Sequence, residues 1–175
     1  QLQVLDGKLN LVAISASQRA ANPDVRYAAV IHHGLEPHVF PFDPDAGKDD
    51  VLAFLGRSSP DKGVLDAIEI ARRVGMPLVM MIKVGEPDEQ AYWRDVVEPN
   101  LHDDVEVIFN AGHEEKVARL TRARALVFPM AWSEPFGLVM IESLACGTPV
   151  VVTRRGSAPE IVVDGETGFL VDPHD

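Results

Sequence analysis

Two glutamates, Glu134 and Glu142, stand eight positions apart and flank the tripeptide Phe136-Gly137-Leu138. An ionised carboxylate can only accept hydrogen bonds, so a pair of them suits the hydroxyl groups of a ribose or another sugar. Between them we predict the start of a helix, where unpaired backbone N–H groups and the helix dipole favour an anion such as phosphate. Two carboxylates would repel a bare phosphate, so the pattern indicates a polyol that carries a diphosphate. The predicted anion site consists of Phe136, Gly137, Leu138 and Val139.

The residues around this site predict the order strand, loop, helix. An apolar run at 126–128 predicts the strand, Ser133 is the candidate helix cap, and Pro135 is tolerated near a helix start. The apolar residues expected on one face of this helix are Leu138, Ile141 and Leu144. In an open α/β sheet, ligands bind where such a loop leaves the carboxyl end of a strand.

Strands and helices alternate from residue 51 onward, which predicts an α/β fold. The continuous apolar strands between amphipathic helices favour a Rossmann-like parallel sheet with helices on both faces. The expected strands are residues 51–55, 78–82, 105–109, 126–128, 150–153 and 169–171. The expected helices are residues 61–74, 89–97 and 114–122, the helix of the glutamate pair, and a short turn at 159–162.

The first fifty residues follow a different pattern. Strands are expected at 11–14 and 28–31, with a short helix capped by Ser15 between them. Residues 37–50 then indicate a linker with a solvated acidic end, because they contain the prolines Pro37, Pro41 and Pro44 and the aspartates Asp43, Asp45, Asp49 and Asp50. We therefore divide the chain into residues 1–50 and residues 51–175.

Several motifs, in the order in which they occur along the chain, resemble the donor-binding domain of retaining, nucleotide-sugar-dependent glycosyltransferases of the GT-B type. The motifs are Glu134-Pro-Phe136-Gly137-Leu138, Glu142, Ala145-Cys-Gly-Thr-Pro-Val-Val151, Pro159-Glu-Ile-Val162, Asp164-Gly-Glu-Thr-Gly168 and, upstream, Phe54-Leu-Gly56-Arg57-Ser-Ser-Pro-Asp-Lys62-Gly63. The resemblance covers residues 51–173. Details at 132–136 and 154–157 resemble a subgroup related to antibiotic-type sugar transferases.

The resemblance implies half of a two-domain enzyme, with residues 1–50 as the end of the acceptor-side domain and its linker, so we expect the chain to be a piece of a longer protein. It implies that Arg57 and Lys62 stabilise the diphosphate leaving group, that Glu134 faces the transferred sugar and that Glu142 binds the ribose, without a metal. The implied catalytic residues are Arg57, Lys62 and Glu134. The implied donor-binding residues are Gly56, Arg57, Lys62, Glu134, Phe136, Gly137, Leu138, Val139 and Glu142. Such a piece is expected to bind a UDP-, GDP- or ADP-type nucleotide sugar without transferring it.

Simpler interpretations remain open for the same residues. Arg57 and Lys62 could be surface residues paired with Asp61 or Asp66, and Glu142 could be an ordinary solvated helix residue. Rival functions are a nucleotide-sugar epimerase of the same fold, a phosphorylase, for which no pyridoxal-phosphate lysine motif is found, and a non-catalytic α/β interaction module. The sequence identifies neither the base, the sugar, the acceptor nor the oligomeric state.

Composition excludes several other classes. A formal charge of −11 argues against nucleic acid as a partner. A single cysteine, Cys146, suits a reducing compartment, and with no signal peptide or membrane-length apolar run we expect a cytoplasmic protein. The histidines and aspartates lack metal-ligand spacing, so no bound metal is expected.

Three positions depart from the family pattern. Residues 80–83 and 108–110 replace strand ends that commonly carry glycine, which leaves the identity of the base open, and His33 stands where an asparagine commonly lies at a turn.

Overall fold

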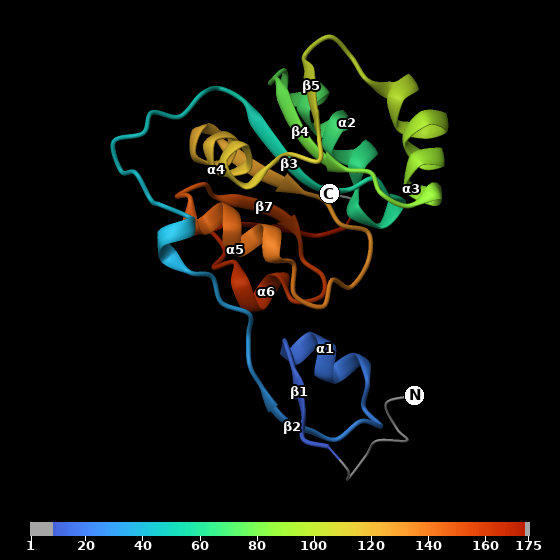
Figure 1. Cartoon of the computed structure of the whole chain (residues 1–175), viewed down its shortest axis with the longest axis vertical. Coiled ribbons are helices and arrows are strands. Elements are labelled where there is room, and N and C mark those ends of the chain that lie inside the picture. The colour runs from blue at the N-terminus through green and yellow to red at the C-terminus, as the bar shows by residue number, and fades with distance from the viewer. Residues whose placement is uncertain (1–8, 174–175) are drawn as a thin grey trace.

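The computed structural model describes residues 9–173 (Figure 1). A small parallel sheet near the N-terminus joins β1 (Leu11–Ala13) and β2 (Tyr27–Val30), with α1 (Ala16–Ala21) between them. The Ser15 hydroxyl accepts a 2.8 Å hydrogen bond from the backbone N–H of Gln18, which confirms the predicted cap. This part of the chain therefore forms one β-α-β unit.

The main sheet has six parallel strands in the order β5-β4-β3-β6-β7-β8, which confirms the predicted α/β fold. The strands are β3 (Leu52–Arg57), β4 (Leu78–Lys83), β5 (Val105–Phe109), β6 (Ala125–Phe128), β7 (Val150–Thr153) and β8 (Gly168–Val171). The helices between them are α2 (Val64–Val74), α3 (Pro87–Tyr92), α4 (His113–Arg122), α5 (Leu138–Ala145) and α6 (Ala158–Ile161). The helical turns are η2 (Pro37–Val39), η3 (Pro60–Lys62), η5 (Glu98–Asn100) and the π-helical η4 (Trp93–Val97).

The strand order reverses between β3 and β6. The chain first winds from β3 outward through β4 to β5, then returns to β6 and winds the other way through β7 to β8. Because crossovers between parallel strands are right-handed, α2 and α3 cover one face while α4, α5 and α6 cover the other. Figure 1 shows α4, α5 and α6 grouped together in this way. The carboxyl ends of β3 and β6 thus bound the crevice where such sheets bind ligands.

The core is apolar on both sides of the central strands. The fully buried side chains include Phe54 on β3, Met80 on β4, Phe128 on β6 and Met140 on α5. Trp93, in the π-helical extension of α3, is buried and packs edge-on against the ring of Phe109 at 4.9 Å. Edge-to-face contact is a favourable arrangement for two aromatic rings.

Two helix starts differ from the prediction. The helix expected from residue 61 begins at Val64, because Gly63 interrupts it with a φ of 73°. A Cβ atom at Gly63 would lie 2.1 Å from the carbonyl oxygen of Pro129, so this close approach requires glycine. Lys62 therefore lies in the turn η3 before the helix rather than in its first turn.

The glutamate-pair helix also begins later than predicted, at Leu138. Its cap is Gly137, with a φ of 78°, so the expected cap Ser133 and early Pro135 are wrong. Leu138 is 45% exposed, and the helix buries Met140 and Ser143 instead of the predicted apolar face. The left-handed turn at Gly137 rotates the helix relative to the loop, which periodicity alone cannot foresee.

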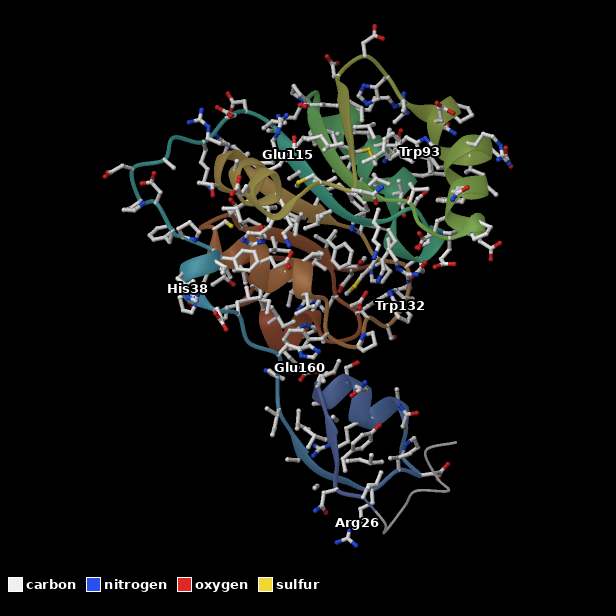
Figure 2. All side chains as sticks on the ribbon, in the orientation of Figure 1. Arg26, His38, Trp93, Glu115, Trp132 and Glu160 are labelled. Atoms are coloured by element: carbon white, nitrogen blue, oxygen red, sulfur yellow. The ribbon has the colours of Figure 1, made fainter. Side chains whose placement is uncertain are left out.

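The junction between the two sheets depends on Glu160, which Figure 2 labels beside α1. Its two carboxylate oxygens accept 2.8 Å hydrogen bonds from the backbone N–H groups of Ala16 and Ser17. His32 Nε2 lies 3.1 Å from the same carboxylate. The linker also contacts the larger part of the chain. Phe40 is buried, and Lys48 Nζ donates a hydrogen bond to the hydroxyl of Thr148 at 2.6 Å.

Asn110, at the end of β5, explains one departure from the family pattern. Its φ is 50°, and within residues 9–173 it is the only non-glycine residue with a positive φ. His33 therefore does not have the positive φ that an asparagine at a turn tolerates. Asparagine tolerates this region better than other side chains do. The strand end therefore keeps a glycine-like backbone without glycine.

We expect Asn110→Gly to leave the free energy of unfolding nearly unchanged, and Asn110→Val to lower it by about 1–3 kcal/mol because a β-branched residue is strained at positive φ. Urea unfolding of both variants beside the wild type measures this. An equal effect of the two substitutions would contradict the conformational explanation.

Candidate functional site

The crevice at the strand-order reversal brings together residues from two loops. Arg57 ends β3, and Lys62 follows in η3. From the other side, the loop after β6 carries Trp132 and Glu134 before it enters α5 at Leu138. The backbone N–H of Ala131 donates to the carbonyl of Asp61 at 2.9 Å, which joins the two loops directly.

Lys62 and Glu134 form an ion pair at the centre of this crevice. Each residue is only 9% exposed, and Lys62 Nζ donates to Glu134 Oε2. The indole N–H of Trp132 donates to the same oxygen at 3.0 Å, and the Lys62 ammonium lies 4.7 Å from the centre of the Trp132 ring. Trp132 itself is 38% exposed and faces the surface of this region (Figure 2). The pair is therefore desolvated and covered by an aromatic side chain that solvent can reach.

The loop that carries Glu134 is held by backbone contacts from the β7–α6 connection. Ser157 donates its N–H to the Glu134 carbonyl at 3.0 Å and its hydroxyl to the Phe136 carbonyl at 2.6 Å. A Cβ atom at Gly156 would lie 2.4 Å from the Glu134 carbonyl oxygen. Glycine is therefore required at 156 for the two loops to approach. The sequence placed both residues in a motif but gave neither this role.

Gly56 lies close to Lys62, and Gly137 lies close to Glu134. A Cβ atom at Gly56 would be 3.8 Å from Cβ of Lys62, and one at Gly137 would be 3.2 Å from Cγ of Glu134. The hydroxyl oxygens of Ser58 and Ser59, between Arg57 and Lys62, are buried and have no hydrogen-bond partner among the described residues. The β3 loop therefore holds hydrogen-bonding capacity that the described chain does not use.

Arg57 contacts a carboxylate that sequence reasoning missed. Its Nη1 atom lies 3.3 Å from Oε1 of Glu89 on α3, whereas the alternative partners proposed for it were Asp61 and Asp66. Glu89 is buried and accepts further hydrogen bonds from the N–H groups of Gly85 at 2.8 Å and Glu86 at 3.3 Å. The Gly85 hydrogen bond, above all, holds the pKa of Glu89 below its ordinary value.

The Glu142 carboxylate pairs with a residue outside the group formed by Arg57, Lys62 and Glu134. Its carboxylate accepts a 2.9 Å hydrogen bond from Lys116 Nζ on α4, and the two side chains are 14% and 19% exposed. The interpretation of Glu142 as an ordinary solvated helix residue is therefore wrong. Among the other predicted residues, Phe136 is buried against the rings of His32 and His33, while Val139 is half-buried.

Two further findings concern the described part of the chain as a whole. Within it, no group of three or more histidine, cysteine, aspartate or glutamate side chains is placed to hold a metal ion. None of its helices combines the length and the apolar character that crossing a membrane would require.

The sequence family described as Glycosyl transferases group 1 matches residues 40–175. The D-inositol 3-phosphate glycosyltransferase of Mycobacteroides abscessus is 34% identical over 168 residues, which is 87% of this chain and 37% of that protein. The glycogen synthase of Mycobacterium tuberculosis is 33% identical over 159 residues, covering 87% of this chain and 38% of that protein. The chain thus spans well under half the length of these relatives.

Solved structures agree with this match. AviGT4, a glycosyltransferase involved in avilamycin A biosynthesis, superposes with a TM-score of 0.75 at 30% identity, over 91% of this chain and 48% of its own. HepE of Anabaena, solved in complex with UDP, reaches a TM-score of 0.81 at 22% identity over 99% of this chain and 53% of its own, which shows the shared fold. The expected fold, one half of a GT-B glycosyltransferase, is confirmed.

The lowered pKa of Glu89 generates a prediction about stability. A carboxyl group whose pKa is lowered by folding stabilises the protein above its unfolded pKa, about 4.3 for glutamate, and loses this contribution as pH falls through the folded value. We expect Glu89→Gln to lower the free energy of unfolding at pH 7 by about 1.5–3 kcal/mol, the usual range for hydrogen bonds to a charged group.

The difference between wild type and Glu89→Gln should shrink as the pH is lowered below about 4.3. Urea unfolding of both proteins at pH 7 and at acidic pH measures it. A difference that stays constant with pH would show that the charge of Glu89 is not what stabilises the loop.

Proposed function

The chain belongs to the glycosyl transferases group 1 family, and from this premise we propose that it is the donor-binding part of a retaining glycosyltransferase. In this proposal it binds a nucleoside-diphosphate sugar at the crevice between β3 and β6. The relatives are more than twice as long as this chain. In this proposal, the whole protein transfers the sugar to an acceptor.

The observation that carries the proposal is the buried ion pair of Lys62 and Glu134 at the strand-order reversal. A buried lysine is costly unless it is paired, and Glu134 supplies that pairing in the absence of a ligand. A diphosphate offers the Lys62 ammonium negatively charged oxygens, as the Glu134 carboxylate does, and carries a greater negative charge than that carboxylate. Lys62 can therefore exchange partners without ever being left unpaired, and Glu134 is then released to accept hydrogen bonds from sugar hydroxyls.

In this proposal, the other site residues bind different parts of the nucleotide sugar. Arg57, at the exposed end of β3, gives planar hydrogen-bond donors to the diphosphate, and the N-terminus of α5 at Leu138 and Val139 adds its dipole. As the bond to the sugar breaks, negative charge builds on the diphosphate, and these groups stabilise it in place of a metal. Glu142 takes the ribose hydroxyls. The hydroxyls of Ser58 and Ser59 are additional donors on the same loop.

The donor type is proposed from relatives. HepE is solved with UDP and with UDP-glucose, which supports a nucleotide sugar as the ligand here, with UDP as the first base to test beside GDP and ADP. We propose that the acceptor binds mainly outside this chain and that this part alone binds nucleotide without transferring sugar. A cytoplasmic location remains a proposal.

The proposal is tested by calorimetric titration of the chain with UDP, GDP and ADP. We expect one of them to bind, and Arg57→Ala to weaken that binding about 10- to 100-fold, since a hydrogen bond to a charged group contributes about 1.5–3 kcal/mol. Arg72→Ala is the matched control, because Arg72 is an exposed arginine near the far end of α2 that pairs with Glu69.

Equal losses in Arg57→Ala and Arg72→Ala would contradict the assigned site. Binding of none of the three nucleotides would contradict the proposal for this chain, and would favour the rival interpretation as a non-catalytic interaction module.

Lys62 gives a second test, on the phosphate rather than the base. Lys62→Met should weaken the nucleoside diphosphate at least tenfold while changing the affinity for the free nucleoside much less, since only the diphosphate replaces Glu134 as partner of the ammonium. Titration with both ligands measures the two affinities, and thermal unfolding checks that the variant folds. Parallel losses for nucleoside and nucleoside diphosphate would contradict the phosphate role.

A further inference from the structure

The contact between Lys116 and Glu142 is more than a surface ion pair. Both side chains are largely buried, and the 2.9 Å bond uses the Oε1 atom of Glu142. Glu142 lies in the second turn of α5, a helix whose buried residues are Met140 and Ser143. A carboxylate in such surroundings requires a partner to offset its desolvation, and α4 provides it.

Lys116 is itself positioned by the linker. Its ammonium lies 5.2 Å from the centre of the Phe40 ring, which is buried. Phe40 in turn packs edge-on against His113 at 4.9 Å, and His113 Nε2 lies 2.6 Å from the carbonyl oxygen of Val39. The linker, α4 and α5 therefore meet around one lysine.

We propose that Lys116 is a positioning residue that fixes the Glu142 carboxylate for the ribose of the nucleotide, with Phe40 of the linker as its support. This inference rests on the proposed function, which gives Glu142 the ribose. It adds that recognition of the ribose depends on a residue of α4 and on the linker, neither of which lies in the motifs around Glu134 and Glu142.

Two physical effects give Lys116 this role. A free glutamate side chain has three rotatable bonds, and ordering it costs conformational entropy. A carboxylate already held by Oε1 therefore binds hydroxyls through Oε2 at a smaller entropic cost. The lysine also neutralises Glu142. A neutral pair does not repel a nearby diphosphate, whereas a bare carboxylate would. The first effect acts on the ribose, whereas the second acts on the diphosphate and therefore favours a ribonucleotide and its deoxy forms alike.

The test compares ribose recognition in three proteins: the wild type, Lys116→Met and Lys116→Arg. Each is titrated calorimetrically with UDP, GDP and ADP and with the 2′-deoxy and 3′-deoxy forms of the one that binds. We expect the wild type to prefer the ribonucleotide by about tenfold or more over at least one deoxy form, in line with hydrogen bonds to a charged group. Lys116→Met should reduce this preference several-fold, and Lys116→Arg should restore most of it.

Arg119→Met is the control, because Arg119 lies one turn further along α4 and pairs with the exposed Glu106. It should keep the wild-type preference. Phe40→Leu is the second variant, because it removes the ring beneath the ammonium while retaining an apolar side chain, and it should lower the preference in the same direction as Lys116→Met. Thermal unfolding confirms that each variant is folded.

The outcomes separate the two proposals. If the wild type binds none of the nucleotides, the proposed function fails. If the wild type binds but does not distinguish ribose from either deoxyribose, or if Lys116→Met keeps the full preference while folded, the inference about Lys116 is overturned and the ion pair serves only to join α4 to α5. Loss of preference in Lys116→Met with recovery in Lys116→Arg supports it.

Discussion

The reversal of strand order between β3 and β6 is the constraint on which the site depends. It places helices that follow neighbouring strands on opposite faces of the sheet, so the loops after β3 and β6 face each other with no helix between them. Lys62 from one loop and Glu134 from the other fill that gap. Gly63 permits the close approach of the β3 loop to Pro129, and Gly156 permits that of the β7–α6 connection to Glu134.

The proposed site residues include three cation–carboxylate pairs. Lys62 pairs with Glu134, Arg57 with Glu89 and Lys116 with Glu142, and in each pair at least one partner is largely buried. Buried pairs seldom add stability, because desolvation consumes most of the attraction between the charges. Their presence is better explained by a ligand that takes over some of these partners. In our account, the cations of the first two pairs turn to the diphosphate, and the anion of the third turns to the ribose.

Strands and their order of appearance could be predicted from the sequence because buried parallel strands are continuous apolar runs, and β5 and β7 match the predicted ranges in full. The helix starts that depend on the backbone conformation of a loop could not be predicted from the sequence. The left-handed turns at Gly63 and Gly137 moved two helix starts, which displaced Lys62 and Leu138 from their expected places. Glu89 and Lys116 escaped notice for another reason: each lies far along the chain from its partner, and no local pattern records that pairing.

The most direct measurement is a crystal structure of the chain with the nucleoside diphosphate that titration selects. The account predicts that Lys62 Nζ contacts phosphate oxygens within about 2.7–2.9 Å, the usual distance of a charge-assisted hydrogen bond, and that Glu134 no longer holds it. Glu142 should contact the ribose while still bonded to Lys116. A nucleotide bound elsewhere, with the pair of Lys62 and Glu134 intact, would contradict the account.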